Sequence, residues 1–227
     1  MTTAEATLRE SFGTIGKQYG YDQVGADYVA YRDFKVKWTR SYKWAEFQVS
    51  DYLMDAPRPV IDGLADTLFT RIVGAEAKPY PEAMTDWITS EGFRRSKQPV
   101  YVRRSRNITK TPEGKSKNLE ESLERLKAMG LVDESARPYL TWTKDELPST
   151  VGYCSTLMDT IVISSALDSD FLPDEALDFA LYHEYLTTRE GWANFGKGEE
   201  IDICTEEKKF KGWKEADGWI RKMCLHL

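Results

Sequence analysis

The sequence predicts an α+β fold in which a small mixed or antiparallel sheet packs against helices. Three observations support this class: short segments alternate apolar and polar residues, longer segments repeat apolar residues at helical spacing, and the composition can fill a core. The chain has 227 residues, 41% of them hydrophobic, with seven tryptophans. Because no repeat or low-complexity linker divides it, we expect one domain over residues 34–227, preceded by an N-terminal arm or helix over residues 1–33.

The first predicted strands form a hairpin. Phe34, Val36 and Trp38 alternate with polar residues, which is the pattern of a half-buried strand with these three side chains inward. A second alternating run follows, with Phe47 and Val49 directed to the core. The turn-forming segment between the runs favours a hairpin. Further strands are predicted over residues 99–107, 138–146 and 159–167.

Helices are predicted where apolar residues recur at three- and four-residue steps. Val60, Leu64 and Leu68 show this spacing in one such segment. Capping residues and glycines mark the ends of several of these segments. The expected helices cover residues 55–74, 81–93, 118–130, 172–188 and, with Gly212 as a candidate interruption, 204–225.

The helix over residues 172–188 contains a near match to the zinc-binding motif H-E-x-x-H. His183 and Glu184 fill the first two positions, but Thr187 stands where the motif has its second histidine. Zinc proteins bind their metal through His, Cys, Asp and Glu, so a threonine hydroxyl is a poor substitute. The whole chain has two histidines, His183 and His226, which excludes a histidine-rich metal site.

The segment "VGYCSTLMDTIVISSALDSDFLPDEALDFALYHEYL" resembles the SprT-like group of zincin metalloproteases. In that pattern a Gly-x-Cys-Ser segment leads into an isoleucine-rich strand, and a proline-started helix then carries the metal-binding histidines. The segments "FKVKWTRSYKWAEFQVSDYLMDAP" and "EEKKFKGWKEADGWI" are similar to the N-terminal and closing parts of a prokaryotic branch of the group. The likeness spans roughly residues 34–222 and implies a single zincin-like domain.

The resemblance implies which residues would form a catalytic site. Metal ligands would be expected at His183, at Thr187 and near Glu199, and Glu184 would be the catalytic base that activates water. Two of these three ligand positions lack histidine, so we expect a pseudo-metalloprotease without zinc that works by binding another protein. The alternative is a zinc-dependent peptidase in which Glu199 (or Glu200) and the Cys204 thiolate join His183 as metal ligands.

The cysteines and the overall charge limit the remaining interpretations of function and localisation. Cys154 paired with His183 could form a nucleophile, but a small packing residue is the favoured interpretation. Cys154, Cys204 and Cys224 form no disulfide pattern, so a reducing cytoplasm is expected. No run of about 18 apolar residues predicts a membrane span. The net charge of −6 argues against nucleic-acid binding by the molecule as a whole.

One stretch of the chain reverses this charge. Residues 94–117 hold nine cations against one acid, Glu113. This basic island could bind phosphates, with Tyr101 available to stack on a base, which makes a nucleic-acid-binding protein the third candidate. The favoured interpretation is a solvated strand edge and loop. Its cations are Arg94, Arg95, Lys97, Arg103, Arg104, Arg106, Lys110, Lys115 and Lys117.

Overall fold

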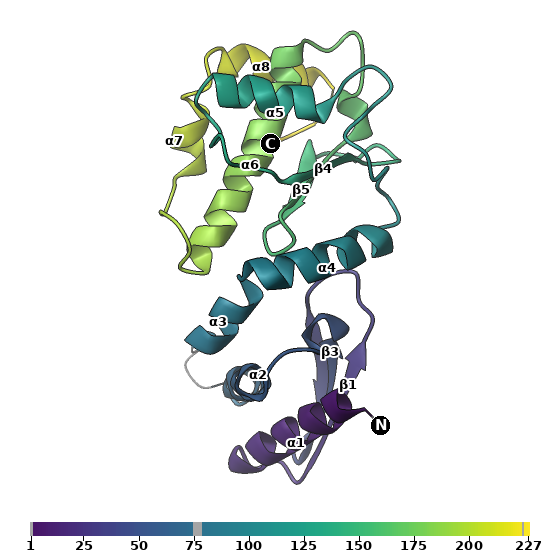
Figure 1. Ribbon diagram of the computed structural model, residues 1–227, viewed down its shortest axis with the longest axis vertical. Helices are drawn as coiled ribbons and strands as arrows, with labels where there is room; N and C mark the ends of the chain where they lie inside the picture. Colours follow the sequence, from purple (N-terminus) through teal and green to yellow (C-terminus); the bar gives the residue numbers. More distant parts are fainter. Residues whose placement is uncertain (1, 75–78, 224) are drawn as a thin grey trace. The chain divides into compact units, whose positions relative to one another are not determined.

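The protein forms two compact units, each with its own sheet and helices (Figure 1). The computed structural model describes residues 2–74, 79–223 and 225–227. Unit 1 is Met1–Arg104 and unit 2 is Ser105–Leu227. Both units combine helices with a three-stranded mixed sheet, so the predicted α+β class is confirmed.

Unit 1 combines one sheet with helices that come before and after it in the chain. Its elements are α1 (Thr3–Gln18), β1 (Gln23–Val29), β2 (Val36–Arg40), β3 (Trp44–Ser50), the 3-10 turn η1 (Asp51–Leu53), α2 (Arg58–Ile72), α3 (Glu82–Ile88) and α4 (Glu91–Arg104). The strand order is β1-β3-β2, with β1 parallel and β2 antiparallel to the central β3. The predicted β2–β3 hairpin is confirmed, and Phe47 and Val49 are buried. Trp38 was expected inward but stays partly exposed, since β2 is an edge strand.

The N-terminal segment, expected as an arm or helix over residues 1–33, begins with helix α1 and contributes to the core of unit 1. Leu8 and Phe12 lie one helical turn apart on α1, and both are fully buried. The Phe12 ring centroid is 4.8 Å from that of Phe47 in β3. β1 extends the same sheet, and the first compact unit continues to Arg104.

Residues 99–104 continue a helix, so the strand predicted over residues 99–107 is wrong. The Ser90 hydroxyl accepts a hydrogen bond from the Phe93 backbone N–H at 3.1 Å and caps the start of α4. Pro99 lies inside α4, where it removes one backbone donor. The helix persists because Phe93 and Tyr101, eight residues apart, are both buried. Tertiary packing here outweighs the strand preference of the alternating valines.

Unit 2 repeats the combination of a small sheet and covering helices. It contains α5 (Leu119–Ala128), β4 (Tyr139–Trp142), β5 (Gly152–Ser155), β6 (Thr160–Ile163), the 3-10 turn η2 (Ser165–Leu167), α6 (Asp174–Asn194), α7 (Ile203–Glu207) and α8 (Trp213–Lys222). The strand order is β4-β6-β5, with β4 parallel and β5 antiparallel to β6. The strands predicted within residues 138–146 and 159–167 are confirmed, in shorter form.

The core of unit 2 is built on α6, which packs against α5 and the sheet. The predicted face of α5 is buried, namely Leu119, Leu123 and Leu126. Asp178 on α6 is also buried and accepts two hydrogen bonds from the Arg125 guanidinium, at 2.8 and 2.7 Å. The Ser122 hydroxyl donates a third, at 2.6 Å. These bonds fix α5 against α6 and so fix the orientation of α6, the helix that carries His183 and Glu184.

The C-terminal region is helical with one interruption, as predicted. Gly212 has φ of 84° in the left-handed region, which glycine adopts without strain, and α8 begins directly after it. Phe210 between α7 and α8 is buried against Phe179 of α6, with ring centroids 5.3 Å apart. Within the described ranges, no helix combines the length and the apolar character needed to traverse a bilayer.

Candidate functional site

The predicted helix that carries His183 and Glu184 is α6, which has 21 residues and an N-terminal half that lies in the core. Pro173 occupies its N-cap position, and Asp174 and Glu175 in the first turn favour the positive end of the helix dipole. In the turns that follow, five side chains are fully buried, namely Ala176, Leu177, Phe179, Ala180 and Leu181. This anchoring holds His183 and Glu184 on a rigid element.

His183 contacts a carboxylate that the sequence analysis did not identify. Its Nδ1 lies 2.6 Å from Oε1 of Glu207, and the two side chains are 19% and 16% exposed. Glu207 is the last residue of α7, and the Tyr182 hydroxyl donates a hydrogen bond to the Glu206 carbonyl at 3.3 Å. The second bond holds α7 beside α6, so Glu207 orients the His183 ring.

Thr187 lies one helical turn after His183 and makes a local hydrogen bond. Its hydroxyl donates to the His183 carbonyl at 3.1 Å, the common back-bonding arrangement of threonine in a helix. His183 and Glu207 thus provide two donors where catalytic zinc sites use three protein ligands. The residues present at this position of α6 do not fit a zinc site.

Glu184 is a buried acid, 5% exposed. Among the described residues, no group is seen to hydrogen-bond to its carboxyl, and burial raises its pKa to about 7. Strand β5 passes directly beside it at Gly152. A Cβ atom there would lie 3.3 Å from Oε1 of Glu184 and 2.3 Å from the Val162 carbonyl oxygen, so only glycine permits this approach.

Cys154 on β5 is a neighbour of this acid and packs against the core of unit 2. Burial, with a smaller contribution from the negative charge of Glu184, raises the pKa of the Cys154 thiol to about 11. A cysteine acts as a nucleophile in its thiolate form, which this environment disfavours at neutral pH. The geometry therefore favours a packing role for Cys154 over a Cys154–His183 nucleophile.

The proposed substitute ligands lie in exposed segments. Glu199 and Glu200 follow the end of α6, and Cys204 lies on α7, all exposed to solvent. In the part of the chain that the structure describes, no three His, Cys, Asp or Glu side chains are grouped to hold a metal ion. In the structure Glu207 therefore contacts His183, whereas Glu199 and Cys204 form no metal-binding group with it. Cys224 lies outside the described residues.

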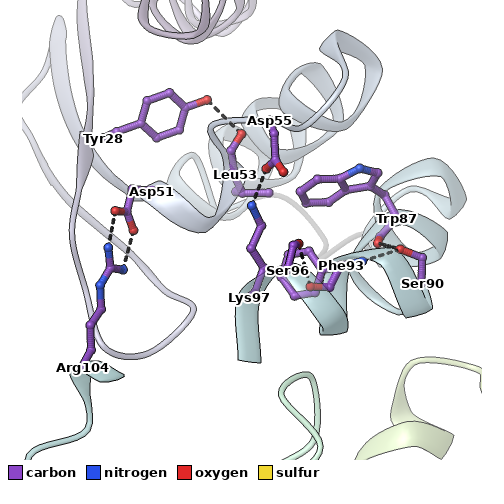
Figure 2. A network of polar contacts seen from close by, with 10 residues as sticks. All are labelled: Tyr28, Asp51, Leu53, Asp55, Trp87, Ser90, Phe93, Ser96, Lys97 and Arg104. Atoms are coloured by element: carbon purple, nitrogen blue, oxygen red, sulfur yellow. Dashed lines mark hydrogen bonds and ion pairs between the residues drawn. The ribbon is translucent and has the colours of Figure 1, made fainter. Parts of the chain in front are cut away.

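Two cations of the basic island hold α4 to the segment that follows β3 (Figure 2). The Arg104 guanidinium donates two hydrogen bonds to Asp51, at 2.7 and 2.5 Å. Lys97 Nζ lies 2.6 Å from Oδ1 of Asp55. Lys97 and Arg104 are seven residues apart, two helical turns, so both reach the same side of α4. Lys97 and Arg104 therefore form ion pairs with Asp55 and Asp51 that stabilise unit 1.

Other members of the island have partners too, and the island spans both units. Arg95 pairs with Glu91 at 2.7 Å on the surface of α4, and Lys117 of unit 2 lies 2.5 Å from Asp174. The predicted solvated strand edge is a helix followed by a loop. Several of its positive charges are therefore already neutralised locally, which weakens the phosphate-binding interpretation.

Replacing Arg104 by glutamine is expected to lower the free energy of unfolding by about 2 kcal/mol, because it removes a bidentate bond to a largely shielded carboxylate. Chemical denaturation followed by circular dichroism measures the change. The matched control is Arg103→Gln, which alters an exposed neighbour on the same helix and should change stability by less than about 0.5 kcal/mol. Equal effects of the two substitutions would contradict a structural role for Arg104.

The candidate site is defined by its own geometry: the His183–Glu207 contact, the buried Glu184 carboxyl and the threonine at position 187. The likeness to SprT-like proteins stays a prediction from sequence motifs. Comparison of the chain with protein-family models, with curated proteins and with solved structures finds no match.

Proposed function

We propose that this protein acts by binding another protein, and that α6 carries the remnant of a zincin-type catalytic centre that no longer holds zinc. The proposal keeps the SprT-like resemblance as the origin of the His183–Glu184 pair. It assigns no hydrolytic step to the chain.

The observation that carries the proposal is the pair of contacts made around His183. One imidazole nitrogen faces the Glu207 carboxylate at 2.6 Å, and the position one turn later offers a hydroxyl that bonds to the backbone. A zinc ion held by fewer than three protein ligands is bound weakly. Glu184, the next residue on α6, then remains a buried acid with no metal-bound water to activate.

The two alternatives have less support. A zinc-dependent peptidase with substituted ligands requires Glu199 or Cys204 to approach His183, and these residues lie in exposed segments. A nucleic-acid-binding protein that uses the basic island requires free cations, whereas Lys97 and Arg104 are engaged by Asp55 and Asp51.

The metal content of the purified full chain tests the proposal. The protein is prepared without chelators, passed over a desalting column and analysed for zinc by elemental mass spectrometry. The expected result is a zinc content far below one ion per chain, unchanged in a His183→Ala variant. One tightly held zinc per chain that disappears in His183→Ala would overturn the proposal and favour the peptidase.

A further inference from the structure

Strand β2 presents an open edge of the unit 1 sheet. The strand order β1-β3-β2 makes it an edge strand, and in the described residues it pairs with β3 alone. Edge strands expose a row of backbone N–H and C=O groups that an additional strand can pair with.

The hydrogen-bond register shows which residues face this open edge. Ser50 N–H donates to the Lys35 carbonyl, and Ser41 N–H donates to the Trp44 carbonyl. In an antiparallel pair, residues alternate between bonded and non-bonded positions. Odd-numbered residues of this segment thus direct their backbone groups to β3. The backbone groups directed to the open edge belong to Val36, Trp38 and Arg40.

The hairpin exposes large aromatic side chains as well as lysines. Trp38 is 45% exposed, Tyr42 87% and Trp44 41%. Lysines such as Lys35 and Lys37 discourage pairing with a basic or purely apolar strand, but an acidic strand would neutralise them. Tryptophan and tyrosine are enriched among the residues that carry binding energy at protein interfaces. The hairpin therefore has the composition of a binding surface.

A cavity lies under the edge strand on the inner side of the sheet. Its volume is about 230 Å³, and its wall includes Val36 and Trp38 of β2, Leu64 and Leu68 of α2, and Met84 of α3. The Val36 and Trp38 side chains lie on the inner face, since they stand opposite the buried Val49 and Phe47. A strand added beside β2 would direct every second side chain towards the same face. The cavity can accept one such apolar side chain.

One wall of the cavity contains a polar group without a partner. Ser50 is 1% exposed, and its hydroxyl makes no hydrogen bond to any described residue. Lys35 and Arg71 also line the cavity, so its wall is mixed polar and apolar and carries positive charge.

The charge of the hairpin selects the kind of partner. Residues 35–44 contain four cations and no acid, in a chain of net charge −6. Lys35 and Lys43 reach carboxylates of the same unit only at 4.0 Å, in exposed pairs that contribute little. Complementary charge steers and orients a partner at such a surface. An acidic segment fits this edge better than a basic one.

We propose that β2 is the docking edge for an extended, acidic segment of a partner protein, which adds a strand to the sheet and inserts one apolar side chain into the cavity. This inference rests on the proposed function and names the chemistry of the protein that the chain binds. The segment alternates carboxylates, which face the basic side chains of the hairpin, with apolar residues on the cavity side.

The test uses the full chain and a fluorescein-labelled peptide of about eight residues that alternates aspartate and leucine. Fluorescence anisotropy measures its binding to the wild type, to Arg40→Pro and to Arg40→Gln. Both substitutions remove the charge, but proline alone removes the backbone N–H directed to the open edge. The expected result is that Arg40→Pro binds the peptide about tenfold more weakly than Arg40→Gln.

Controls separate this proposal from other surfaces and from loss of folding. A lysine–leucine peptide and a labelled oligothymidylate should both bind more weakly than the aspartate–leucine peptide. Preference for either control, no binding of the acidic peptide, or equal binding by the two Arg40 variants would overturn the proposal. If Arg40→Pro fails to fold, Trp38→Ala replaces it, and an unchanged affinity there has the same meaning. Zinc content is measured separately, so a zinc-free chain that ignores the peptide refutes only this inference.

Discussion

The Glu184→Gln variant is expected to be more stable than the wild type at pH 8, by about 3 kcal/mol in the free energy of unfolding. Burial raises the pKa of Glu184 from 4.5 to about 7 in the folded protein. At pH 8 the folded wild type therefore holds a buried carboxylate, whose loss of solvation destabilises it. Glutamine has a similar shape and stays neutral at every pH.

The direction of this stability change follows from how the ionisation of Glu184 depends on pH. Because the folded pKa of Glu184 lies above the unfolded one, its contribution to stability is complete below pH 4.5 and is lost as the pH rises through about 7. Urea unfolding at pH 5 and pH 8 measures the difference, which should be largest at pH 8. Glu190→Gln changes an exposed acid on the same helix and is the control. No gain at pH 8 would show that the carboxyl has a stabilising partner.

One zinc ion per chain is expected in the Thr187→His variant. A histidine at this position would share one face of α6 with His183, four residues earlier. Glu207 already lies 2.6 Å from Nδ1 of His183, so a metal held by this nitrogen would also be within reach of the carboxylate. Two histidines and a glutamate form the ligand set of a known class of catalytic zinc sites. A single substitution should therefore change a chain without zinc into one that keeps it through desalting.

Two controls identify the ligands of the introduced site. Thr187→Val has the shape of threonine without a donor atom, and it should leave the zinc content at the wild-type level. Thr187→His combined with Glu207→Gln should lose the metal, because an amide oxygen is a weaker zinc ligand than a carboxylate. Elemental mass spectrometry measures all three variants. Stoichiometric zinc in the double variant would rule out Glu207 as the third ligand.

Local sequence signals predicted the elements that depend on neighbouring residues. Asn118 accepts a hydrogen bond from the Glu120 backbone N–H and caps α5, and the leucine spacing of this helix matches its buried face. The strand prediction for residues 99–107 was wrong because two alternating valines favour a strand, whereas Phe93 and Tyr101 bury one face of a helix. That burial depends on the rest of unit 1, which local patterns do not show.

The division of the chain had no signal in the composition. Linkers between compact units are commonly rich in proline, glycine or polar residues, but the boundary falls between Arg104 and Ser105 within a run of basic residues. The burial of Phe12 against Phe47 of β3 was equally hidden. Both facts follow from contacts between segments far apart in the sequence.

The sequence identified His183 and Glu184 as a candidate pair but missed Glu207. Glu207 is 24 residues away from His183, and no periodicity relates the two positions. The available signal was the "EKKF" segment itself, which begins at Glu207 and which the family resemblance places near the third metal ligand. The raised pKa of Glu184 comes from burial by β5, so it required the structure.

Two separate cores have a consequence for calorimetry of this chain. Units 1–104 and 105–227 each bury their own apolar residues, so heating can melt them in two distinct endotherms, for which a single midpoint temperature is not a defined quantity. Glu184 belongs to the second unit. Its substitution should displace only the endotherm of that unit, and the other peak then serves as an internal standard in the same scan.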